Sequence, residues 1–483
     1  MTLVAGIDSS TQSCVIVLRD VDDGRVVAAA RSPHPVTTPP VSEQHPNAWW
    51  SALVDAARQL AMSDVAALSV DGQGHGLVAL DSDHAVIRPA KLWNDTTSAP
   101  EAAELVARVG RESWARRTGS VPTAAFTITK LLWVARHEPA NFARIAAVLL
   151  PADWLMYRLT GQFRTDRSAA SGTGYYSAIE SAWLPDLLAE VGGPGWLPEL
   201  PVVVGPDEAA GRVTPKAADE LGIRAGLPVG PGCNDQPPAA LALGADRGDV
   251  IMSLGTSGTV FTSSETPTAD PSGAVTGVCD AAGGFLPLVC TLNAAKVTDA
   301  FARLLGVDHA ELARLALAAP PAPNRPVLVP YLDGERTPNR PDARGTLAGL
   351  GSDVTREAIA RAAFEGVVCG LLDGLDALAA AGARVDGRLI VTGGGARSAA
   401  YRQLLADLSG RPVHTSTLTD TAAAGAAVQA GAVLLGRSVR EVARAWAPPL
   451  HVAAEPRPGQ GTAELRERYR GVSRLEELDT RTR

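Results

Sequence analysis

Residues Gly230-Pro231-Gly232-Cys233-Asn234-Asp235-Gln236-Pro237-Pro238 and Met252-Ser253-Leu254-Gly255-Thr256-Ser257-Gly258-Thr259 form two loops rich in glycine and hydroxyl side chains. The first loop holds an acid, Asp235, at the entrance to a helix of small residues. The second is typical of a tight turn between two apolar strands. Exposed backbone N–H groups and hydroxyls in such a turn suit phosphate oxygens, and a nearby carboxylate can accept a proton. The two loops together indicate phosphoryl transfer.

The second loop has a counterpart near the start of the chain. Ile7-Asp8-Ser9-Ser10-Thr11-Gln12-Ser13-Cys14-Val15-Ile16 aligns with Met252 to Phe261, with apolar residues and hydroxyls in register. A strand, turn and strand that recur in two halves predict two related domains, each of which presents one hydroxyl turn to a shared cleft. For the first turn taken alone, a plain hairpin is the simpler interpretation.

Length and composition set the class of protein. With 483 residues the chain exceeds one ordinary core, and a typical domain of about 150 residues predicts roughly three units or two large ones. Apolar residues make up 46%, charged residues 20%, and the formal net charge is -8, which is ordinary for a soluble globular enzyme. Because no basic stripe is present, we expect neither a nucleic acid nor an anionic membrane as partner.

Cysteine usage and apolar runs indicate the compartment. The five cysteines are scattered and never spaced as C-x-x-C, so they predict neither a disulfide framework nor a zinc site. The first apolar run, Leu3 to Ile7, lacks a cationic leader, and no uninterrupted apolar run reaches the length that spans a bilayer. We therefore expect a cytoplasmic protein.

Two further loops in the first half carry polar side chains at the ends of predicted strands. Asp71-Gly72-Gln73-Gly74-His75-Gly76 follows the strand Val65 to Val70, at the end where ligands bind in open α/β sheets. The alternative is a flexible turn with a solvated histidine. In Leu92-Trp93-Asn94-Asp95 the Trp face suits one side of a polyol, and the amide and acid suit its hydroxyls. The alternative is that Trp93 fills the core.

A triple glycine marks the second half. Arg388 to Thr392 is a predicted strand that runs into Gly393-Gly394-Gly395-Ala396-Arg397-Ser398, and a helix follows. Glycines permit close approach to a ligand, and the helix N-terminus offers unpaired N–H groups, so this geometry is typical of a phosphate or nucleotide loop. The G-x-G-x-x-G spacing of dinucleotide-binding dehydrogenases is missing, which argues against that class.

In this order the loops resemble the FGGY family of carbohydrate kinases, and within it the xylulokinases most closely. The resemblance covers roughly residues 3 to 440 and rests on an ordered set of separated segments. These are residues 6–11, 42–46, 72–76, 92–95, 129–133, 234–235, 253–258, 334–338 and 393–398.

The resemblance implies an α/β fold with two duplicated domains of the actin-like, ribonuclease-H-like ATPase type and a central cleft. ATP and the sugar would meet in that cleft, which closes to exclude water. We expect a sugar-binding domain at residues 1–245 that carries the catalytic base, a nucleotide-binding domain at 246–445, and a C-terminal tail at 446–483.

The resemblance also implies roles for individual residues, with ATP and Mg²⁺ as cofactors. Asp235 matches the catalytic base, and Asp8 matches the acid that orients the metal and the transferring phosphate. The expected sugar-binding residues are Gly74, His75, Trp93, Asn94, Asp95 and Gln236. The expected nucleotide-binding residues are Thr11, Gln12, Gly255, Thr256, Gly394, Gly395 and Ala396. An acid before Pro-Pro at a helix start is also a sound N-cap, which is the alternative for Asp235.

The activity implied is ATP-dependent phosphorylation of a sugar hydroxyl, from D-xylulose to D-xylulose 5-phosphate. Three departures leave the acceptor open: Gly74 where xylulokinases commonly carry Met, Gln236 where they carry Asn, and Thr96-Thr97 where they carry Gly-Arg. The alternatives are a kinase for another ketopentose, a pentitol or glycerol, and a non-catalytic, nucleotide-dependent regulatory protein. The expected partners are a small sugar and ATP, without nucleic acid or membrane, and a homodimer is allowed.

Overall fold

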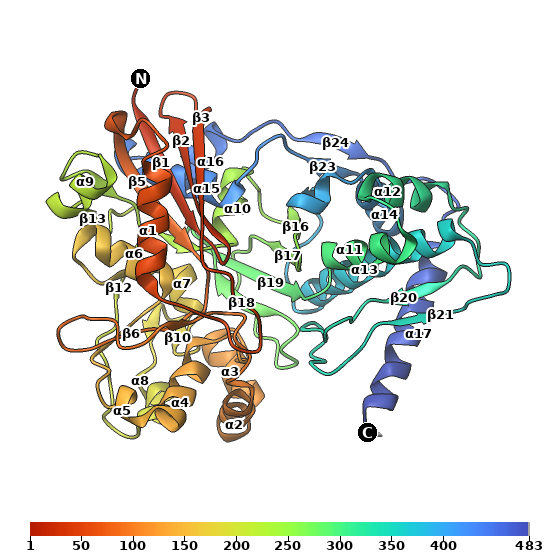
Figure 1. The fold of residues 1–483 in the computed structure, drawn as a ribbon, viewed down its shortest axis with the longest axis horizontal. Coiled ribbons are helices and arrows are strands. Elements are labelled where there is room, and N and C mark those ends of the chain that lie inside the picture. Colours follow the sequence, from red (N-terminus) through yellow and green to blue (C-terminus); the bar gives the residue numbers. More distant parts are fainter. Residues whose placement is uncertain (482–483) are drawn as a thin grey trace. The chain divides into compact units, whose positions relative to one another are not determined.

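The computed structural model describes residues 1–481 and divides them by packing into two units (Figure 1). Unit 1 comprises residues 1–245, 265–286 and 418–448, and unit 2 comprises residues 246–264, 287–417 and the described residues from 449 onward. Residues 482 and 483, the end of the expected tail, lie outside the described residues. The sugar-binding and nucleotide-binding domains expected at 1–245 and 246–445 stay a prediction about function.

Unit 1 is built on one mixed sheet. β1 (Leu3–Ser9) pairs antiparallel with β2 (Ser13–Asp20) and parallel with β5 (Val65–Gly72). β3 (Val26–Pro33) extends the sheet beyond β2, and β15 (Cys233–Asn234) pairs parallel with β5. Nearly every residue of β1, β2 and β5 is buried, as expected for strands that are covered on both faces.

Alternate residues of β1 face two different cores. Leu3, Ala5 and Ile7 belong to a core with the helices α1 (Pro46–Ala57) and α6 (Pro151–Thr160). Val4 belongs to a core with α15 (Thr421–Leu435). Because side chains alternate along a strand, the two helical layers cover opposite faces of the sheet.

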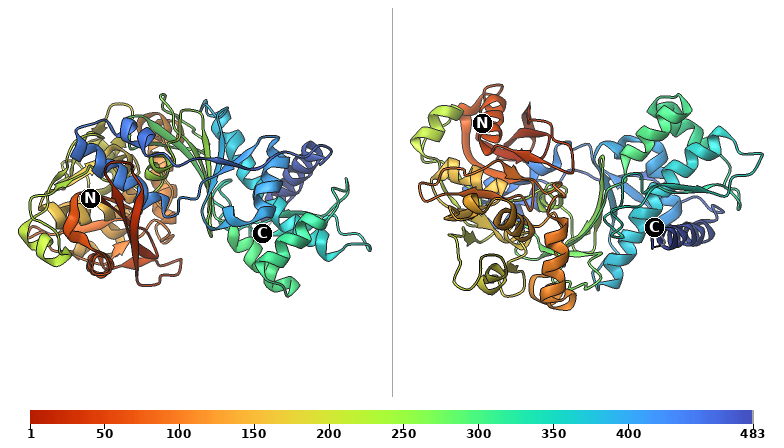
Figure 2. Two further views of the ribbon diagram at one scale, coloured as in Figure 1. Left: turned by 90° about the horizontal axis from the view of Figure 1, so that it is seen from above. Right: turned by 60° about the horizontal axis from the view of Figure 1, so that its bottom comes forward.

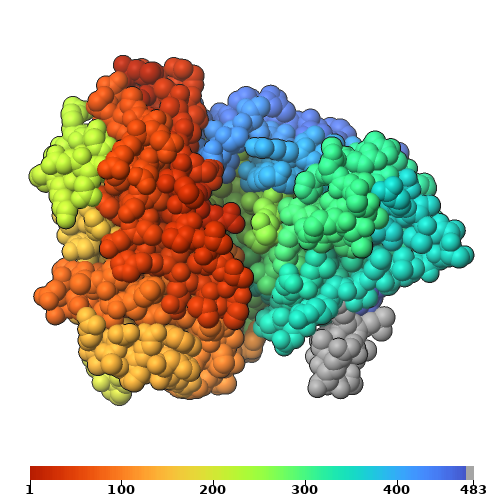
Figure 3. Space-filling view, in the orientation of Figure 1, coloured from red at the N-terminus to blue at the C-terminus, as the bar shows by residue number. Residues whose placement is uncertain are grey.

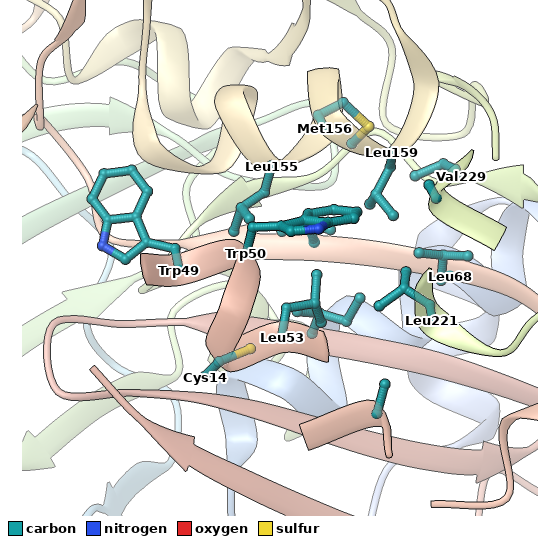
Figure 4. Packing of buried hydrophobic residues seen from close by; sticks show 14 of the residues in the cluster. Cys14, Trp49, Trp50, Leu53, Leu68, Leu155, Met156, Leu159, Leu221 and Val229 are labelled. Atoms are coloured by element: carbon teal, nitrogen blue, oxygen red, sulfur yellow. The ribbon is translucent and has the colours of Figure 1, made fainter. Parts of the chain in front are cut away.

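The first core is centred on the tryptophans of α1. His45 caps this helix by accepting a hydrogen bond from the Asn47 backbone N–H over 3.2 Å. Trp50 then packs among Leu53 of its own helix and Leu155 of α6, as Figure 4 shows. Burial of a large apolar side chain contributes about 1.5–3 kcal/mol, so this layer is a main source of stability in unit 1.

On the second face of the sheet, α15 lies unusually close to β1. A Cβ at Gly6 would come 1.8 Å from the Ala423 carbonyl oxygen, so only glycine permits α15 to lie against β1. Ten residues of α15 are buried, and most of them are alanine or glycine. Small side chains on both partners therefore fix the helix close to the strand ends where the candidate site lies.

One side of the surface of unit 1 is formed mainly by the N-terminal residues, which are coloured red and orange in Figure 3. Further elements complete this unit. They are β4 (Glu43–Gln44), a 3-10 turn (Met62–Asp64), β6 (Val78–Leu80), β7 (Ala90–Lys91), α2 (Ala99–Val109), α3 (Arg111–Thr118), α4 (Thr127–His137), α5 (Pro139–Phe142), β8 (Ala147–Leu149), β9 (Arg164–Asp166), α7 (Arg167–Ser171), β10 (Tyr176–Ser177), β11 (Ala182–Trp183), α8 (Pro185–Gly192), β12 (Val202–Val204), β13 (Gly211–Arg212), α9 (Pro215–Leu221), β14 (Pro228–Val229), α10 (Pro237–Ala242), β18 (Thr276–Cys279) and α16 (Val439–Ala445).

Unit 2 repeats the central part of this sheet. β16 (Val250–Leu254) pairs antiparallel with β17 (Gly258–Thr262) and parallel with β22 (Leu389–Thr392). β17 pairs antiparallel with β19 (Phe285–Thr291), so β19-β17-β16-β22 has the order and directions of β3-β2-β1-β5. The prediction of two duplicated α/β domains is confirmed.

The helices of unit 2 pack around α13 (Arg356–Ala380), and α11 (Ala295–Leu305) and α12 (His309–Ala318) lie beside it (Figures 1 and 2). The other elements are β20 (Val327–Val329), β21 (Thr346–Ala348), a 3-10 turn (Gly394–Arg397), α14 (Ala399–Ser409), β23 (Val413–Thr415), β24 (His451–Ala454) and α17 (Thr462–Arg481).

Within residues 1–481, no helix taken singly is long and apolar enough to cross a membrane. α15 and α16 meet that test only as a pair, with a bend of 118° between them.

Candidate active site

Three carboxyl groups meet at one edge of the unit 1 sheet. Asp8 lies near the end of β1 and is the register partner of Asp71 on β5. On the other side of β5, Cys233 of β15 is paired with Asp71, and Asp235 follows β15 directly. Register partners on neighbouring strands point to the same face of a sheet. The fold therefore brings together acids from three distant parts of the chain.

Asp71 is fully buried at this edge, and Asp8 and Asp235 are half-buried. Asp71 is 0% exposed, and neither of its oxygens nor Oδ1 of Asp8 has a hydrogen-bond partner among the described residues. Burial first, and then the charge of Asp235, raise the pKa of Asp8 to about 7, although Arg31 acts in the opposite direction. Burial and the charge of Asp8 raise the pKa of Asp71 well above its usual range. Protonation of Asp8 is therefore linked to protonation of Asp71, and the charge of Asp235 acts on both.

The donor set at this edge fits a hard divalent cation. Mg²⁺ prefers oxygen ligands and is usually held by one or two carboxylates together with water and substrate phosphates. Asp8 Oδ1 offers an unpaired carboxylate oxygen of this kind. Residues 1–481 contain no group of three or more His, Cys, Asp or Glu arranged to hold a metal by themselves. The fit is therefore to an ion that shares its ligands with phosphate and water.

The first hydroxyl turn touches the predicted sugar-binding tryptophan. Trp93 Nε1 donates a hydrogen bond to Thr11 Oγ1 over 2.8 Å, and Gln44 Nε2 donates to the Thr11 carbonyl over 3.1 Å. Gln12 is exposed, and Trp93 is half-buried. The structure thus brings together Thr11, from the predicted phosphate turn, and Trp93, from the predicted sugar pocket.

His75 is held in one orientation by the segments around it. Its φ is +62°, its Nδ1 lies 2.6 Å from the Gly172 carbonyl oxygen, and its ring packs 4.6 Å from that of Phe126. Thr127 Oγ1 donates to the His75 carbonyl over 3.0 Å. The interpretation of this loop as a flexible turn with a solvated histidine is wrong, because His75 is only 7% exposed.

Asp95 and Asn94 differ in how their polar atoms are used. Asp95 is fully buried, accepts hydrogen bonds from the Ser42 and Thr97 N–H groups over 2.9 and 3.1 Å, and forms an ion pair with Lys91 at 3.1 Å. Burial acts to raise its pKa, but these partners outweigh burial and hold the pKa below its usual range. The structural role of Asp95 is thus evident. Asn94, in contrast, is half-buried with Oδ1 unpaired among the described residues.

Asp235 and Gln236 lie side by side at the start of α10. Both are half-buried. The N-cap position of α10 belongs to Gln236, which makes no side-chain cap hydrogen bond. The sequence alternative in which Asp235 serves as the cap of this helix is therefore wrong, because Asp235 lies one residue before the cap.

In unit 2 the predicted nucleotide residues lie at the ends of β16 and β22. Thr256 is exposed at the β16–β17 turn, and the Gly255 N–H donates to the Ser257 carbonyl over 3.0 Å. After β22 the chain forms the 3-10 turn Gly394–Arg397 and then α14, as the triple glycine predicts. A Cβ at Gly394 would meet nothing within 4 Å, so this backbone is open to a ligand.

The structure adds two residues for which no separate role was predicted. Asp71 is the central acid of the three, and Gln73 is 2% exposed with both side-chain amide atoms unpaired among the described residues. Both lie in the loop that the sequence marks as a ligand site. The signal that could have indicated Asp71 is its position at the end of an otherwise apolar strand.

The structure has duplicated α/β domains. One carries convergent acids and the other carries a glycine loop, and this combination defines a class of protein: a phosphotransferase of the actin-like ATPase fold. The sequence matches the FGGY family of carbohydrate kinases, with its N-terminal domain at residues 3–242 and its C-terminal domain at residues 250–434. The chain belongs to this family, and it is a carbohydrate kinase with ATP and a sugar as substrates. The predicted family and fold are confirmed.

Its relatives point to one branch of the family. The chain is 44% identical over 448 residues to xylulose kinases of Streptomyces rubiginosus and Streptomyces coelicolor, and each alignment covers 92% of this chain and 90% of the relative. The crystal structure of xylulose kinase from Bifidobacterium adolescentis is similar, with a TM-score of 0.86 and 40% identity, and covers 97% of this chain and 99% of that chain.

Proposed function

We propose that the protein transfers the γ-phosphate of ATP to the terminal hydroxyl of D-xylulose, giving D-xylulose 5-phosphate and ADP. The observation that carries this proposal is 44% identity to xylulose kinases over 92% of the chain. Unit 1 supports it, because its sheet edge holds carboxyls suited to accept a hydroxyl proton and to face a phosphate with its cation.

Asp235 acts as the general base in this proposal. It is half-buried beside β15, and its charge acts on both Asp8 and Asp71. As the sugar hydroxyl oxygen bonds to the γ-phosphorus, its proton passes to the Asp235 carboxylate and the bond between that phosphorus and ADP breaks. A positioned base of this kind contributes about 10²- to 10⁴-fold in rate.

Asp8 is the residue that we assign to Mg²⁺. Its Oδ1 is buried and unpaired among the described residues, which leaves lone pairs for a hard cation. When bound, Mg²⁺ neutralises charge that develops on the transferring phosphate. Asp8 orients that phosphate from the end of β1, next to the hydroxyl turn.

The remaining residues are assigned either to the sugar or to the nucleotide. The sugar is bound by Gly74, His75, Trp93, Asn94, Asp95 and Gln236. The phosphates and adenosine are bound by Thr11, Gln12, Gly255, Thr256, Gly394, Gly395 and Ala396. The hydrogen bond between Trp93 and Thr11 supports placing the acceptor hydroxyl near the phosphate turn.

A kinase for another ketopentose, a pentitol or glycerol is the second candidate, and two residues favour it. Gln236 follows the proposed base directly, and Gly74 lies against Asn234, the residue before the base, so these departures from the xylulokinase pattern can change the shape of the acceptor pocket. We further propose a cytoplasmic location and small-molecule substrates only, and this proposal allows a homodimer.

The proposal is tested by ADP release with D-xylulose and magnesium ATP. Asp235→Ala and Asp235→Asn are expected to lower kcat by at least about 10²-fold, because both remove the proton acceptor. Asparagine keeps the volume of the side chain, so a loss in Asp235→Asn separates base chemistry from packing. Calorimetric ATP binding and the melting temperature should stay near wild type. Activity of either variant within a few-fold of wild type would contradict the assignment of Asp235 as the general base.

A further inference from the structure

Asn234 holds the backbone of the proposed base in place. Its Oδ1 accepts a hydrogen bond from the Asp235 backbone N–H over 2.8 Å, and Asn234 itself is only 4% exposed. A buried side chain of two rotatable bonds that is hydrogen-bonded to the next peptide group restricts the orientation of that peptide. The side chain of Asp235 starts from this restricted position.

A second set of contacts fixes Asn234 from the other side. The Asn234 backbone N–H donates to Ser168 Oγ over 3.1 Å, and Ser168 Oγ donates to Asp166 Oδ1 over 2.9 Å. Asp166 is the N-cap of α7 and also accepts from the Ala169 N–H over 2.8 Å. The residue before Asp235 is therefore anchored through a buried polar chain to the start of a helix.

Gly74 provides the space that the Asn234 amide occupies. A Cβ at position 74 would come 2.5 Å from Asn234 Oδ1 and 2.8 Å from its Nδ2. The backbone of Gly74 does not adopt a positive φ, so glycine is not required there by conformation. It is required because the amide of Asn234 fills the volume that a side chain would take.

We propose that Asn234 is a positioning residue for Asp235 and that Gly74 and Asn234 form a size-matched pair that shapes the acceptor pocket beside it. This inference rests on the proposed function, since it concerns the base of that reaction. A side chain at position 74 displaces the amide, the hydrogen bond to Asp235 N–H is lost, and the carboxylate is free to shift. Displacement of a catalytic group by about 1 Å can cost up to about 10²-fold in rate.

A double-mutant cycle tests the pair. Gly74→Ala and Asn234→Ala are each expected to lower kcat for sugar phosphorylation by about 10- to 100-fold, with the KM for ATP unchanged. Because both act through one hydrogen bond, the double variant should lose little more than the worse single variant. Losses that multiply in the double variant, or Asn234→Ala with kcat within 2-fold of wild type, would overturn the proposal.

A matched control and a second readout keep the test independent of activity. Gly211→Ala controls for crowding, because its Cβ would come 2.9 Å from Thr160 Cβ on another part of unit 1. It should leave kcat unchanged. Hydrogen–deuterium exchange of the peptide that spans Asp235 should become faster in Gly74→Ala and Asn234→Ala but not in Gly211→Ala. Faster exchange in a protein that phosphorylates no sugar would support the pair and contradict the proposed function, whereas unchanged exchange would contradict the pair.

Discussion

β1 of unit 1 and β16 of unit 2 hold the same place in two duplicated sheets, but their ends carry different chemistry. The register partners at the end of β1 and β5 are Asp8 and Asp71. At the end of β16 and β22 they are Ser253 and Thr392. The fold thus fixes where strand ends converge, and we propose that the side chains placed there decide which part of the reaction each unit handles.

The two pairs of strand ends differ in charge and in hydration. Buried carboxylate oxygens without hydrogen-bond partners among the described residues, both of Asp71 and Oδ1 of Asp8, favour a bound cation or proton, whereas two neutral hydroxyls are tolerated beside the anionic phosphates of a nucleotide. Unit 2 adds an open glycine backbone after β22, where a Cβ at Gly394 would meet no neighbour within 4 Å. We therefore expect exchange of side chains between the two ends to be costly in both directions.

The largest effect is expected when the acid end is made to resemble the hydroxyl end. Asp8→Ser places in unit 1 the residue type that unit 2 carries at the equivalent position. It should lower kcat for sugar phosphorylation by more than about 10²-fold, because charge stabilisation by a metal is worth several kcal/mol. Steady-state kinetics over a range of Mg²⁺ concentrations measure this. A variant with near-normal kcat and unchanged Mg²⁺ dependence would remove Asp8 from the reaction.

The reverse exchange is expected to act on nucleotide binding. Ser253→Asp introduces a carboxylate at the end of β16, near the proposed phosphate turn. Repulsion of only about 1.4 kcal/mol corresponds to a tenfold change, so we expect the KM for ATP to rise at least about tenfold. The KM for the sugar should change little. Ser253→Ala is the matched control, and an equal rise in both variants would show that charge is not the cause.

A smaller effect is expected from filling the open backbone of unit 2. Gly394→Val should raise the KM for ATP by about tenfold or less with little change in melting temperature, because a Cβ at this position meets no protein atom within 4 Å and the added side chain is expected to oppose mainly a ligand. Gly471→Val is the control, since Gly471 also has no neighbour within 4 Å but lies in α17. Unchanged ATP kinetics in Gly394→Val would move the nucleotide away from this turn.

The smallest effect is expected on stability, at Asp71. Burial raises its pKa in the folded protein, so its contribution to stability is complete below its ordinary pKa and is lost as pH rises through the raised value. Asp71→Asn removes this loss of stability at higher pH, because asparagine does not ionise. The gain in melting temperature relative to wild type should therefore be larger at pH 8 than at pH 5. Each 1 kcal/mol of difference in the free energy of unfolding corresponds to about 2–4 °C. Thermal unfolding without nucleotide or Mg²⁺ measures it, and an equal change at both pH values would contradict the account.

The duplicated fold could be predicted because its signal is local. Ile7 to Ile16 and Met252 to Phe261 each carry an apolar strand, a hydroxyl turn and a second strand, and both form antiparallel pairs beside a parallel strand. The triple glycine was likewise followed by the expected helix, α14. Alternation of apolar and turn residues within about ten positions carries this information without reference to the rest of the chain.

The parts that could not be predicted depend on contacts between distant segments. Asp71 is unusual only because Asp8 and the segment of Asp235 lie on either side of its strand. The fit of Gly74 to Asn234 has the same origin. The return of residues 418–448 to unit 1 also escaped prediction, because α15 is alanine- and glycine-rich all round and no polar face indicates which sheet it covers.

The central claim is that this chain is a sugar kinase for D-xylulose, and ADP release by the wild-type enzyme tests it most directly. Magnesium ATP is supplied with ketopentoses, pentitols or glycerol in parallel, and kcat/KM is compared across the set. The account predicts turnover with D-xylulose far above that with every other acceptor, and release of one ADP for each D-xylulose 5-phosphate formed. Preference for glycerol or a pentitol, or no ADP release with any acceptor, would contradict it.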